Sequence, residues 1–422
     1  MTSPLDADVL VVGGGPAGAS TAFQLARRGV RVRILDRARF PRAKPCAECL
    51  SPEASRLLHD MGVLRELEPR AARLRGVLVR SPDGTEARGD YRASHRYRGY
   101  NDHGLSLRRE LLDDALLRSA RAGGAQVDEG VRVVDVLRDT AGGTGRSRAC
   151  GVIVMDAKGA TRELRAGLII GADGLRSLVA RRLGLARAST WPSRIAIVAH
   201  YRDVAEVGDL VELHVESDGF VGIAGVGGGV TTVAAVFPRR RAREFAREPD
   251  AFLRRWLGSK PHLEHRFAAA ITDGEVRVTG PFASRARRAW AHGALLVGDA
   301  ADFFDPFTGE GIYAGLRGGE LAADAACATL DAGAAGAEAG RAYDVARRRE
   351  FGGKWRVEHL IGLCVASPAI MNRATRSLAA HKPLADLLAG VTGDFVPARL
   401  VLRLGFLARL LVLPPPTQAA WR

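Results

Sequence analysis

The sequence predicts an α/β fold that opens with a Rossmann-like dinucleotide-binding unit, and three neighbouring features carry this prediction. Residues 8–12 (DVLVV) form a short apolar run that indicates a buried strand. The stretch GGGPAGAS follows at once and opens a helical pattern, with Gly13, Gly15 and Gly18 in the G-x-G-x-x-G spacing. A second strand then alternates apolar residues with arginines and ends at Asp36. Strand, glycine turn, helix and acidic strand end together indicate dinucleotide binding.

Each glycine of this turn has its own physical role. Gly13 permits the tight turn, Gly15 lets the backbone approach a pyrophosphate, and Gly18 lets the helix pack closely on the strand. The start of the helix then presents backbone N–H groups to the phosphates. Asp36 follows Gly18 by 18 residues, where a carboxylate can accept hydrogen bonds from a ribose diol. The motif alone leaves open whether the dinucleotide is NAD or FAD.

Two distant segments add further strand-and-turn patterns. Residues 169–184 (IIGADGLRSLVARRLG) run from an apolar strand into Asp173 and then into a helix that begins near Ser177. Downstream, the strand in GALLVGDAADFFDPFTGEG leads to Asp299, six further residues and then Pro306, before an amphipathic helix. Asp299 therefore follows the carboxyl end of a strand, which is where open α/β sheets bind ligands.

These segments resemble the fingerprints of flavoprotein monooxygenases of the p-hydroxybenzoate hydroxylase type and of the related geranylgeranyl reductases, over most of the chain. The resemblance implies a glutathione-reductase-type FAD-binding domain that holds FAD without a covalent bond. It implies that Asp299 contacts the ribityl chain and that the helix after Pro306 faces the pyrimidine edge of the flavin. Arg109 corresponds to an arginine that neutralises the pyrophosphate, with Arg108 as an alternative contact, and Val133 falls where backbone holds adenine.

The motif and the resemblance together select a set of cofactor-binding residues that is spread over three segments. The set is Gly13, Gly15, Ala17, Gly18, Asp36, Arg37, Arg109, Val133, Asp173, Asp299, Pro306, Gly309, Gly311 and Ile312.

The domain organisation follows from the same segments. Alternating runs such as RIAIVAHYRDV and GVTTVAAVF indicate antiparallel strands, and the resemblance implies that they form an inserted sheet that covers the flavin and binds substrate. The stretch DAGAAGAEAG at 331–340 indicates a flexible connection to a helical C-terminal region. The expected division is an FAD-binding domain at 1–74, 101–182 and 279–330, a substrate-binding β-sheet domain at 75–100 and 183–278, and a linker with a helical C-terminal region at 331–422.

The last helical stretch, RLVLRLGFLARLLVLPPP, indicates an apolar stripe. Leu400, Leu404, Leu407 and Leu411 fall on one face of a continuous helix. The stretch is too short and too often interrupted by arginine to span a bilayer, which needs about 20 apolar residues. We expect this helix to pack on the protein's own core, and a peripheral membrane contact is the alternative.

Two of the five cysteines, Cys46 and Cys49, lie in KPCAECLSP and allow three interpretations. A zinc site needs four ligands, and the chain has no second such pair. A redox disulfide is the second interpretation, since glutathione reductase relatives place a cysteine pair after the same strand, although at another spacing. We favour a third, a flavin pocket wall, because geranylgeranyl reductases carry a stretch resembling KPCGGGLS. Cys46 is then the catalytic candidate beside the isoalloxazine, while Ala47, Glu48 and Cys49 depart from the glycines of that stretch.

The function that this pattern favours is an FAD-dependent monooxygenase. It would use NADPH or NADH and dioxygen to hydroxylate an aromatic, polyketide-like or lipid-like small molecule, with the flavin supplying the chemistry. The alternative is saturation of prenyl double bonds, although GFVGIAGVG lacks the Y-x-W-x-F-P stretch of such reductases. A flavin disulfide oxidoreductase, a halogenase, whose W-x-W-x-I-P is also missing, and a lipid carrier without redox chemistry are minor alternatives.

Amino-acid composition limits the possible partners and the expected location of the protein. The net charge is +15, from 62 Lys and Arg against 47 Asp and Glu, but the basic residues are scattered without interleaved aromatics, which disfavours nucleic acid as a partner. An odd number of cysteines and an N-terminus without a basic stretch before its apolar run favour the cytoplasm, with peripheral membrane contact as an option. We expect a small-molecule substrate, no metal, and no obligatory protein partner.

Overall fold

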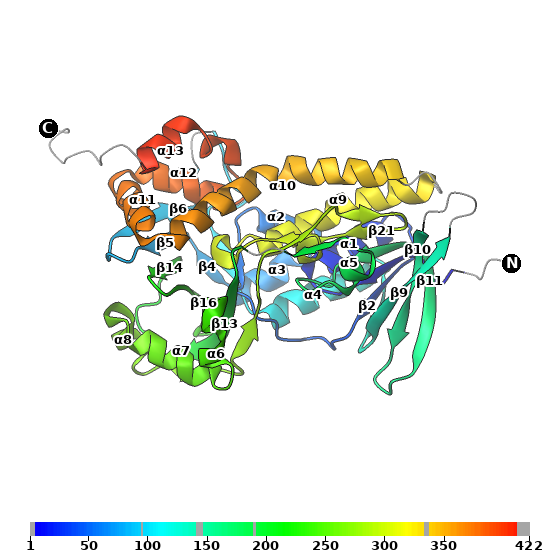
Figure 1. The fold of residues 1–422 in the computed structure, drawn as a ribbon, viewed down its shortest axis with the longest axis horizontal. Coiled ribbons are helices and arrows are strands. Elements are labelled where there is room, and N and C mark those ends of the chain that lie inside the picture. Colours follow the sequence, from blue (N-terminus) through cyan, green and yellow to red (C-terminus); the bar gives the residue numbers. More distant parts are fainter. Residues whose placement is uncertain (1–4, 94–95, 141–146, 189–190, 333–336, 412–422) are drawn as a thin grey trace.

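The computed structural model describes residues 5–93, 96–140, 147–188, 191–332 and 337–411. Its first layer is a sheet of eight strands with the order β20-β21-β11-β1-β2-β8, extended by β10 and β9 beside β11 (Figure 1). Five of these strands are parallel, namely β1 (Ala7–Val12), β2 (Val32–Asp36), β8 (Gln126–Glu129), β11 (Thr161–Gly171) and β21 (Ala294–Leu296). Antiparallel partners are β9 (Arg132–Thr140), β10 (Ser147–Met155) and β20 (Trp290–Ala291).

Helices cover this sheet and complete the main hydrophobic core. Strand β1 is almost entirely buried, as a central strand of a parallel sheet must be. The helix α1 packs against both α4 and α9. The helices of this half are α1 (Pro16–Ala26), α2 (Ala54–Asp60), α3 (Leu64–Leu67), α4 (Arg109–Ala122), α5 (Leu178–Arg182) and α9 (Gly311–Ala332).

A second sheet of eight strands lies beside the first half of the molecule (Figure 1). Its order is β17-β13-β16-β15-β14-β5-β6, and β18 also pairs with β13. The strands are β5 (Gly76–Arg80), β6 (Glu86–Asp90), β13 (Arg194–Arg202), β14 (Leu210–Glu216), β15 (Gly219–Gly225), β16 (Val230–Pro238), β17 (Ile271–Thr272) and β18 (Arg277–Thr279). On one face, α6 (Ala242–Phe245), α7 (Pro249–Gly258) and α8 (Pro261–Phe267) form a second core with this sheet.

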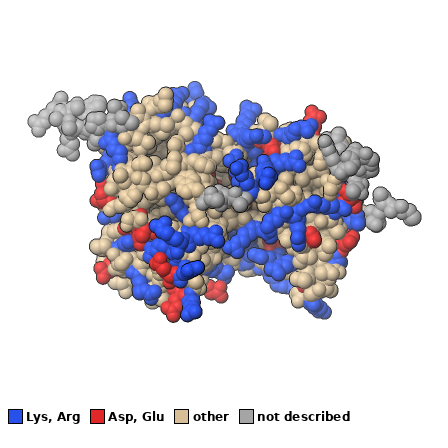
Figure 2. Space-filling model, in the orientation of Figure 1, with Lys and Arg blue, Asp and Glu red and all other residues tan. Residues whose placement is uncertain are grey.

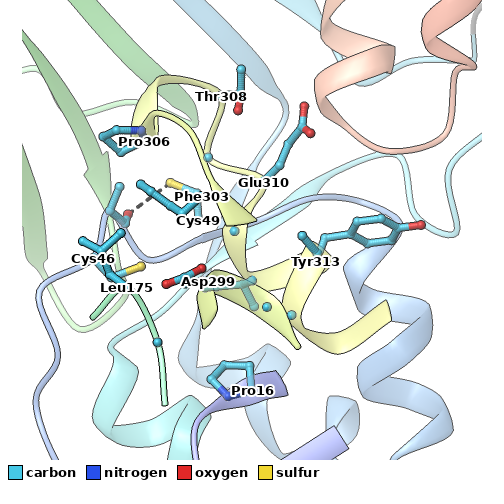
Figure 3. Close-up of a pocket in the computed structure, with 18 of the residues that line it drawn as sticks. Pro16, Cys46, Cys49, Leu175, Asp299, Phe303, Pro306, Thr308, Glu310 and Tyr313 are labelled. Carbon is cyan, nitrogen blue, oxygen red and sulfur yellow. Dashed lines mark hydrogen bonds between the residues drawn. The ribbon is translucent and has the colours of Figure 1, made fainter. Parts of the chain in front are cut away.

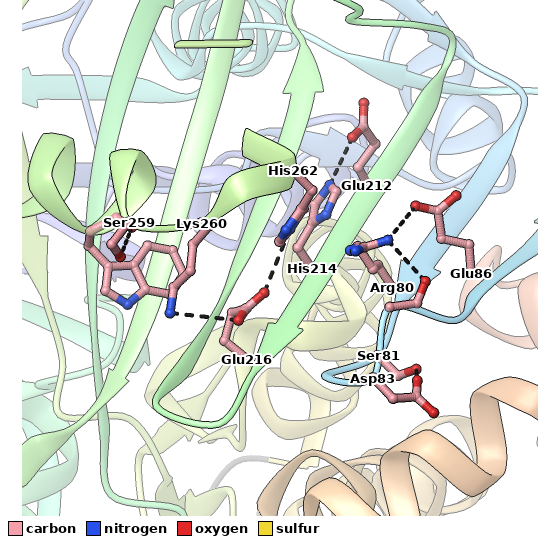
Figure 4. A network of polar contacts seen from close by, with 12 residues as sticks. Arg80, Ser81, Asp83, Glu86, Glu212, His214, Glu216, Ser259, Lys260 and His262 are labelled. Carbon is pink, nitrogen blue, oxygen red and sulfur yellow. Dashed lines mark hydrogen bonds and ion pairs between the residues drawn. The ribbon is translucent and has the colours of Figure 1, made fainter. Parts of the chain in front are cut away.

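That helix-covered face also carries a buried polar network beside its apolar core (Figure 4). Glu212 accepts hydrogen bonds from Arg266 at 2.5 and 2.9 Å and lies 2.9 Å from His214. The His214 ring stacks on that of His262, which lies near Lys260, and burial lowers the pKa of His262 to about 4. These contacts fasten α8 to β14 on the side opposite to the residues that line the cavity described below.

The C-terminal helices cover the other side of the second sheet. The long helix α10 (Ala337–Ala366) crosses the top of Figure 1 from the first half to the helices α11 (Pro368–Ala380), α12 (Lys382–Thr392) and α13 (Leu404–Leu411). Both α11 and α12 pack on β6. Two three-stranded sheets join the halves, β3 (Cys49–Leu50) with β7 (Gly104–Ser106) and β4 (Ala72–Leu74), and β12 (Ala186–Ala188) with β19 (Ser284–Ala286) and β22 (Asp302–Phe303).

Three sequence-based expectations differ from this fold. The second sheet is mixed, because β14 and β5, which come from separate segments, pair in parallel. The predicted flexible connection is helical at both ends, since α9 continues through Ala332 and α10 begins at Ala337, and residues 333–336 lie outside the described residues. The described residues at both ends, such as Ala332, Ala337 and Glu338, are good helix formers.

The predicted leucine stripe is the third expectation that was wrong. Leu400 lies in a separate 3₁₀ turn, so the helical phase starts anew at α13. Phe406 and Leu410 are the buried residues of α13, whereas the Leu404 side chain is 85% exposed. The helix packs on the protein, but through another face.

The charge distribution matches the scattered pattern of the sequence. On the face shown in Figure 2, basic side chains spread over both halves with acidic side chains among them, and many basic groups are paired in salt bridges. In the part of the chain that the structure describes, every helix is too short or too polar to traverse a lipid bilayer.

Candidate functional site

A cavity of about 1190 Å³ runs from the carboxyl ends of β1, β11 and β21 into the space between the second sheet and the C-terminal helices. Of the 14 cofactor-binding residues expected from the sequence, all except Gly18 line it. They come from three segments, yet they meet near the carboxyl ends of the parallel strands, which is where open α/β sheets bind ligands. Figure 3 shows Pro16, Asp299, Pro306 and Cys46 around this space.

The glycine turn has the geometry of a phosphate cradle. Gly13 has a φ of 104°, and an added Cβ would lie 2.4 Å from the carbonyl oxygen of Ala172. A Cβ on Gly18 would lie 1.8 Å from the carbonyl oxygen of Gly13, so Gly18 serves close packing and does not face the cavity. A Cβ on Gly15 would meet only Arg42, at 3.6 Å. Gly15 therefore leaves open space for a ligand at the start of α1.

Asp36 ties the end of β2 to the glycine turn. Its carboxylate accepts hydrogen bonds from the backbone N–H groups of Gly14, at 2.7 Å, and Ala38, at 2.8 Å. Its side chain lines the cavity and is only slightly exposed. Each carboxylate oxygen can accept a further hydrogen bond, so Asp36 can hold the turn and bind a diol at the same time. The exposed Arg37 lines the cavity beside it.

The structure separates the two candidate arginines of α4. Arg109 lines the cavity and binds Asp113 through two hydrogen bonds of 2.8 and 2.7 Å. Burial disfavours its charge, but Asp113 and the Cys46 side chain raise the pKa of Arg109 overall, so it stays cationic. Arg108 instead turns to the second sheet and pairs with Asp273. Arg109 is thus the arginine that can face a pyrophosphate.

Two cations of this site were not selected from the sequence. Arg42 lines the cavity over Gly15, and its Nη1 lies 3.0 Å from the carboxylate of Asp113. Lys44 lines the cavity too, and burial, together with nearby Arg109, lowers the pKa of its ammonium group. Both could have been found from the sequence, because they lie in a short basic stretch, RAKPC, that follows the acidic strand end at Asp36 and leads into the cysteine segment.

The remaining expected residues line the cavity from three further directions. Val133 lies near the start of β9, and Asp299 lies in a 3₁₀ turn directly after β21. Asp173 lines the cavity but also caps α5, because its Oδ2 accepts the N–H groups of Leu178 and Val179 at 2.6 and 3.2 Å. Its Oδ1 is buried and has no hydrogen-bond partner among the described residues.

The loop before α9 approaches the cavity with its backbone. Pro306 opens a 3₁₀ turn whose last residue precedes Gly309, and Gly309 has a φ of 71° with open space around it. Gly311 begins α9, and Ile312 follows on its buried face. The first N–H groups of α9 have no partners within the helix, so this loop can bind the polar edge of a flavin.

The segment KPCAECLSP forms part of the cavity wall. Cys46 and Cys49 are not bonded to each other, and both line the cavity (Figure 3). Cys49 donates to the carbonyl oxygen of Ala47 at 3.2 Å, and burial, with a smaller effect of Cys46, raises the pKa of the Cys49 thiol to about 12. A thiol that stays protonated at neutral pH is a poor partner for disulfide exchange. Within the described residues, no three His, Cys, Asp or Glu side chains are grouped to hold a metal ion.

Glu48 fixes this segment in place. Its φ is 62°, which is a left-handed conformation that favours glycine. The buried carboxylate accepts the N–H of Arg109 at 2.8 Å and lies 2.6 Å from Nε2 of His200 on β13. Glu48 thus connects the cysteine segment to α4 and to the second sheet, and these contacts offset the backbone strain.

The second half of the cavity is lined mainly by apolar side chains and is not built from any sequence motif. The second sheet contributes Val77, Val79, Ala87, Gly89, Leu213, Gly222 and Ala224, and the C-terminal helices contribute Ile361, Leu378, Ala385, Leu388 and Ala389. We call this set the apolar gallery. The C-terminal region, which the sequence suggested only as a packed tail, is therefore part of the site.

The donor groups of the first half suit FAD. A glycine turn at a helix start suits a pyrophosphate, and Asp36 suits a ribose diol. The loop before α9 offers backbone N–H groups to an isoalloxazine ring. Comparison with known protein families agrees with this fit, because residues 6–350 match the model of the FAD binding domain. The chain belongs to this family of FAD-dependent enzymes.

The relatives of this family member carry out different reactions. The chain is 29% identical over 331 residues to menaquinone reductase of Mycobacterium tuberculosis, covering 75% of this chain and 76% of that protein. It is 30% identical over 346 residues to digeranylgeranylglycerophospholipid reductase of Methanosarcina mazei, covering 77% and 76%. It also matches conditioned medium factor receptor 1 of Dictyostelium discoideum at 27% identity, and spans 62% of that protein's length.

Solved structures agree on the fold. A myxobacterial FAD-dependent halogenase, the chondrochloren halogenase, superposes with a TM-score of 0.76 and 26% identity, covering 84% of this chain and 82% of that one. Reductases and halogenases thus share this architecture, and the chain is an FAD-dependent oxidoreductase of the superfamily that includes geranylgeranyl reductases.

Proposed function

We propose that this protein is an FAD-dependent hydroxylase of a lipid-like molecule, one with an oxidisable ring or head and a long apolar chain. The observation that carries the substrate class is the apolar gallery, which continues the flavin-facing part of the cavity between β6 and α12. Burying an apolar chain there is favourable by about 25 cal/mol per Å² of surface removed from water. FAD would supply the redox chemistry, with NADPH or NADH as reductant and dioxygen as oxidant.

The chain's own residues would hold FAD and exclude water. Arg109, Arg42 and the start of α1 would bind the pyrophosphate, and Asp36 the ribose. The Glu48 carboxylate, held by Arg109 N–H and His200, would keep the cysteine segment closed over the ring. Hydroxylation is favoured over double-bond reduction because Ala47, Glu48 and Cys49 replace the glycines of the reductase stretch and because β15 lacks its tryptophan and proline.

A second candidate function is reduction of a carbon–carbon double bond in an isoprenoid-like chain. The identity to two reductases over three quarters of the chain favours it. Product analysis separates the two. With ¹⁸O₂ and reduced nicotinamide cofactor, hydroxylation puts one labelled oxygen into the product, whereas reduction adds only hydrogen. Turnover without label would reject hydroxylation.

The substrate class has a separate test in Gly222. A Cβ at this position would lie 3.6 Å from Leu213 and would meet no backbone clash, so Gly222→Val should fold and bind FAD normally. The added methyl groups would narrow the apolar gallery. We expect KM for a long-chain substrate to rise about tenfold, with little change for a short-chain analogue; an equal effect on both substrates would contradict the proposal.

A further inference from the structure

Two carboxyl groups line the cavity without a partner, at the junction between its two halves. Glu310 belongs to the loop before α9, between Gly309 and Gly311, and is 6% exposed. Glu358 lies on the side of α10 that faces the cavity. Neither side chain forms a hydrogen bond or an ion pair with any residue in the described part of the chain. Buried carboxyl groups are normally paired, so the unpaired Glu310 beside a ligand cavity, with the half-buried Glu358 also lining it, indicates a ligand.

The direction of Glu310 supports this interpretation. In Figure 3 its carboxyl group points away from Asp299 and Cys46, and so away from the cradle expected to hold FAD. Tyr91 follows β6, and β6 forms one wall of the apolar gallery. Burial raises the pKa of Tyr91, and the charge of nearby Glu310 raises it further. Glu310 therefore lies where a substrate would pass from the flavin into the gallery.

The surroundings of Glu310 favour its neutral form. Burial raises the pKa of Glu310 to about 7, although Lys354 on α10 works in the opposite direction. The Lys354 ammonium pairs with Asp394 and lies 4.2 Å from the centre of the Tyr313 ring. Lys354 therefore has other interaction partners than Glu310. Burial also raises the pKa of Glu358, and Glu310, Asp302 and Asp305 raise it further.

We propose that Glu310 is a substrate-recognition residue whose neutral carboxyl group donates a hydrogen bond to a carbonyl oxygen of the substrate at the entrance of the apolar gallery. The inference rests on the proposed function in that it assumes a substrate lying across both halves of the cavity. It adds a chemical requirement that the apolar gallery alone does not set, namely a hydrogen-bond-accepting oxygen at the point where the substrate enters the gallery.

The experiment compares two probes that differ in one oxygen atom, 4-decylacetophenone and 1-decyl-4-ethylbenzene. Calorimetric titration of the FAD-loaded protein at pH 6 should show about fivefold tighter binding of the ketone, as expected for one neutral hydrogen bond. The preference should be present below about pH 7 and disappear as pH rises above it, because ionised Glu310 can no longer donate. Equal binding of the two probes at pH 6 would overturn the proposal.

Three variants assign the effect to Glu310. Glu310→Met should abolish the ketone preference while leaving binding of the hydrocarbon unchanged. Glu310→Gln should keep the preference and lose its pH dependence, because an amide donates at every pH. Glu338→Gln, at an exposed glutamate near the start of α10, is the matched control and should behave as the wild type. Parallel weakening of both probes in Glu310→Met would mean that Glu310 only shapes the cavity, which would also overturn the proposal.

A direct measurement keeps the inference testable if Glu310→Met does not fold. The infrared C=O stretch of a protonated carboxyl group should be present at pH 6, should fade through about pH 7, and should be reduced in Glu310→Gln. A wild-type spectrum identical to that of Glu310→Gln would reject the neutral acid. Because binding is read without turnover, a failure of the proposed hydroxylation leaves these results unaffected.

Discussion

The two halves of the cavity are built by different means. The FAD cradle, formed by the glycine turn, Asp36 and the loop before α9, depends on backbone geometry that only particular residues permit. The apolar gallery depends mainly on side chains from β5, β6, β14, β15, α10, α11 and α12, most of which another apolar residue of suitable size could replace. Gly89 is an exception, because a Cβ there would lie 2.5 Å from the carbonyl oxygen of Ala385. The two halves thus differ in what they require of the sequence: the cradle needs particular residue types at fixed positions, while most positions of the gallery need only an apolar side chain of suitable size.

The largest expected effect is in the cradle, at Gly18. In Gly18→Ala the new Cβ would overlap the carbonyl oxygen of Gly13, so α1 must move from the sheet. We expect a loss of unfolding free energy of about 3 kcal/mol and loss of bound FAD. Thermal unfolding and the flavin content of the purified protein measure both.

The control for this prediction is Gly352→Ala. Gly352 lies inside α10 with nothing within 4 Å of the new Cβ, so alanine should stabilise the helix by about 0.5 to 1 kcal/mol. If Gly18→Ala were as well tolerated as Gly352→Ala, the close packing of α1 on the glycine turn would not constrain the cradle.

Asp36→Ala should have the next largest effect. The substitution removes an acceptor from the Gly14 and Ala38 N–H groups and from the ribose, so FAD binding should weaken by about 1.5 to 3 kcal/mol. Titration of the apoprotein with FAD measures the change. Asp324→Ala, at an exposed residue paired with Arg28, should bind FAD as the wild type does. Equal FAD affinities for the two variants would show that Asp36 does not contribute to FAD binding.

Glu48 tests the contact between the two halves. Glu48→Ala loses the hydrogen bonds to Arg109 N–H and His200 and keeps the left-handed backbone, so unfolding free energy should fall by about 2 kcal/mol. Glu48→Gly should lose less, because glycine relieves the strain. A double-mutant cycle with His200→Ala should give a coupling energy above about 0.5 kcal/mol. Additive effects would show that the contact across the two halves contributes nothing.

The smallest effect is expected at Cys49. Its thiol, with a pKa raised to about 12 by burial, stays protonated at neutral pH, so Cys49→Ala should change turnover by less than about twofold. Cys46→Ser, on the cavity wall, should instead alter the flavin spectrum. Anaerobic reduction should consume one electron pair per FAD. Uptake of a second pair would establish a redox-active disulfide and reject the wall interpretation.

The sequence alone determined the cradle. Gly13, Gly15 and Asp36 could be selected because a tight turn, a close backbone approach and an acidic strand end each demand a particular residue type. Asp173 and Asp299 could be selected because their segments resemble the fingerprints of the family. Such demands are local, so they are visible as motifs with fixed spacing. The parallel strands, α1 and the helix after Pro306 follow from the same local patterns.

Only the tertiary structure decided which residues line the gallery, that the C-terminal helices border the cavity, and that Glu48 and Glu310 are buried. Apolar residues of β6 and α12 look like ordinary core in the sequence, and their exposure to a cavity depends on how α12 packs on the second sheet. Glu48 and Glu310 look like surface glutamates, yet both are buried, and each interacts with a residue more than 40 positions away. Glu48 contacts His200, and Glu310 lies close enough to Lys354 for the lysine charge to counter the rise in its pKa that burial causes. Long-range burial leaves no local pattern, because it is set by the packing of segments that the chain brings together only on folding.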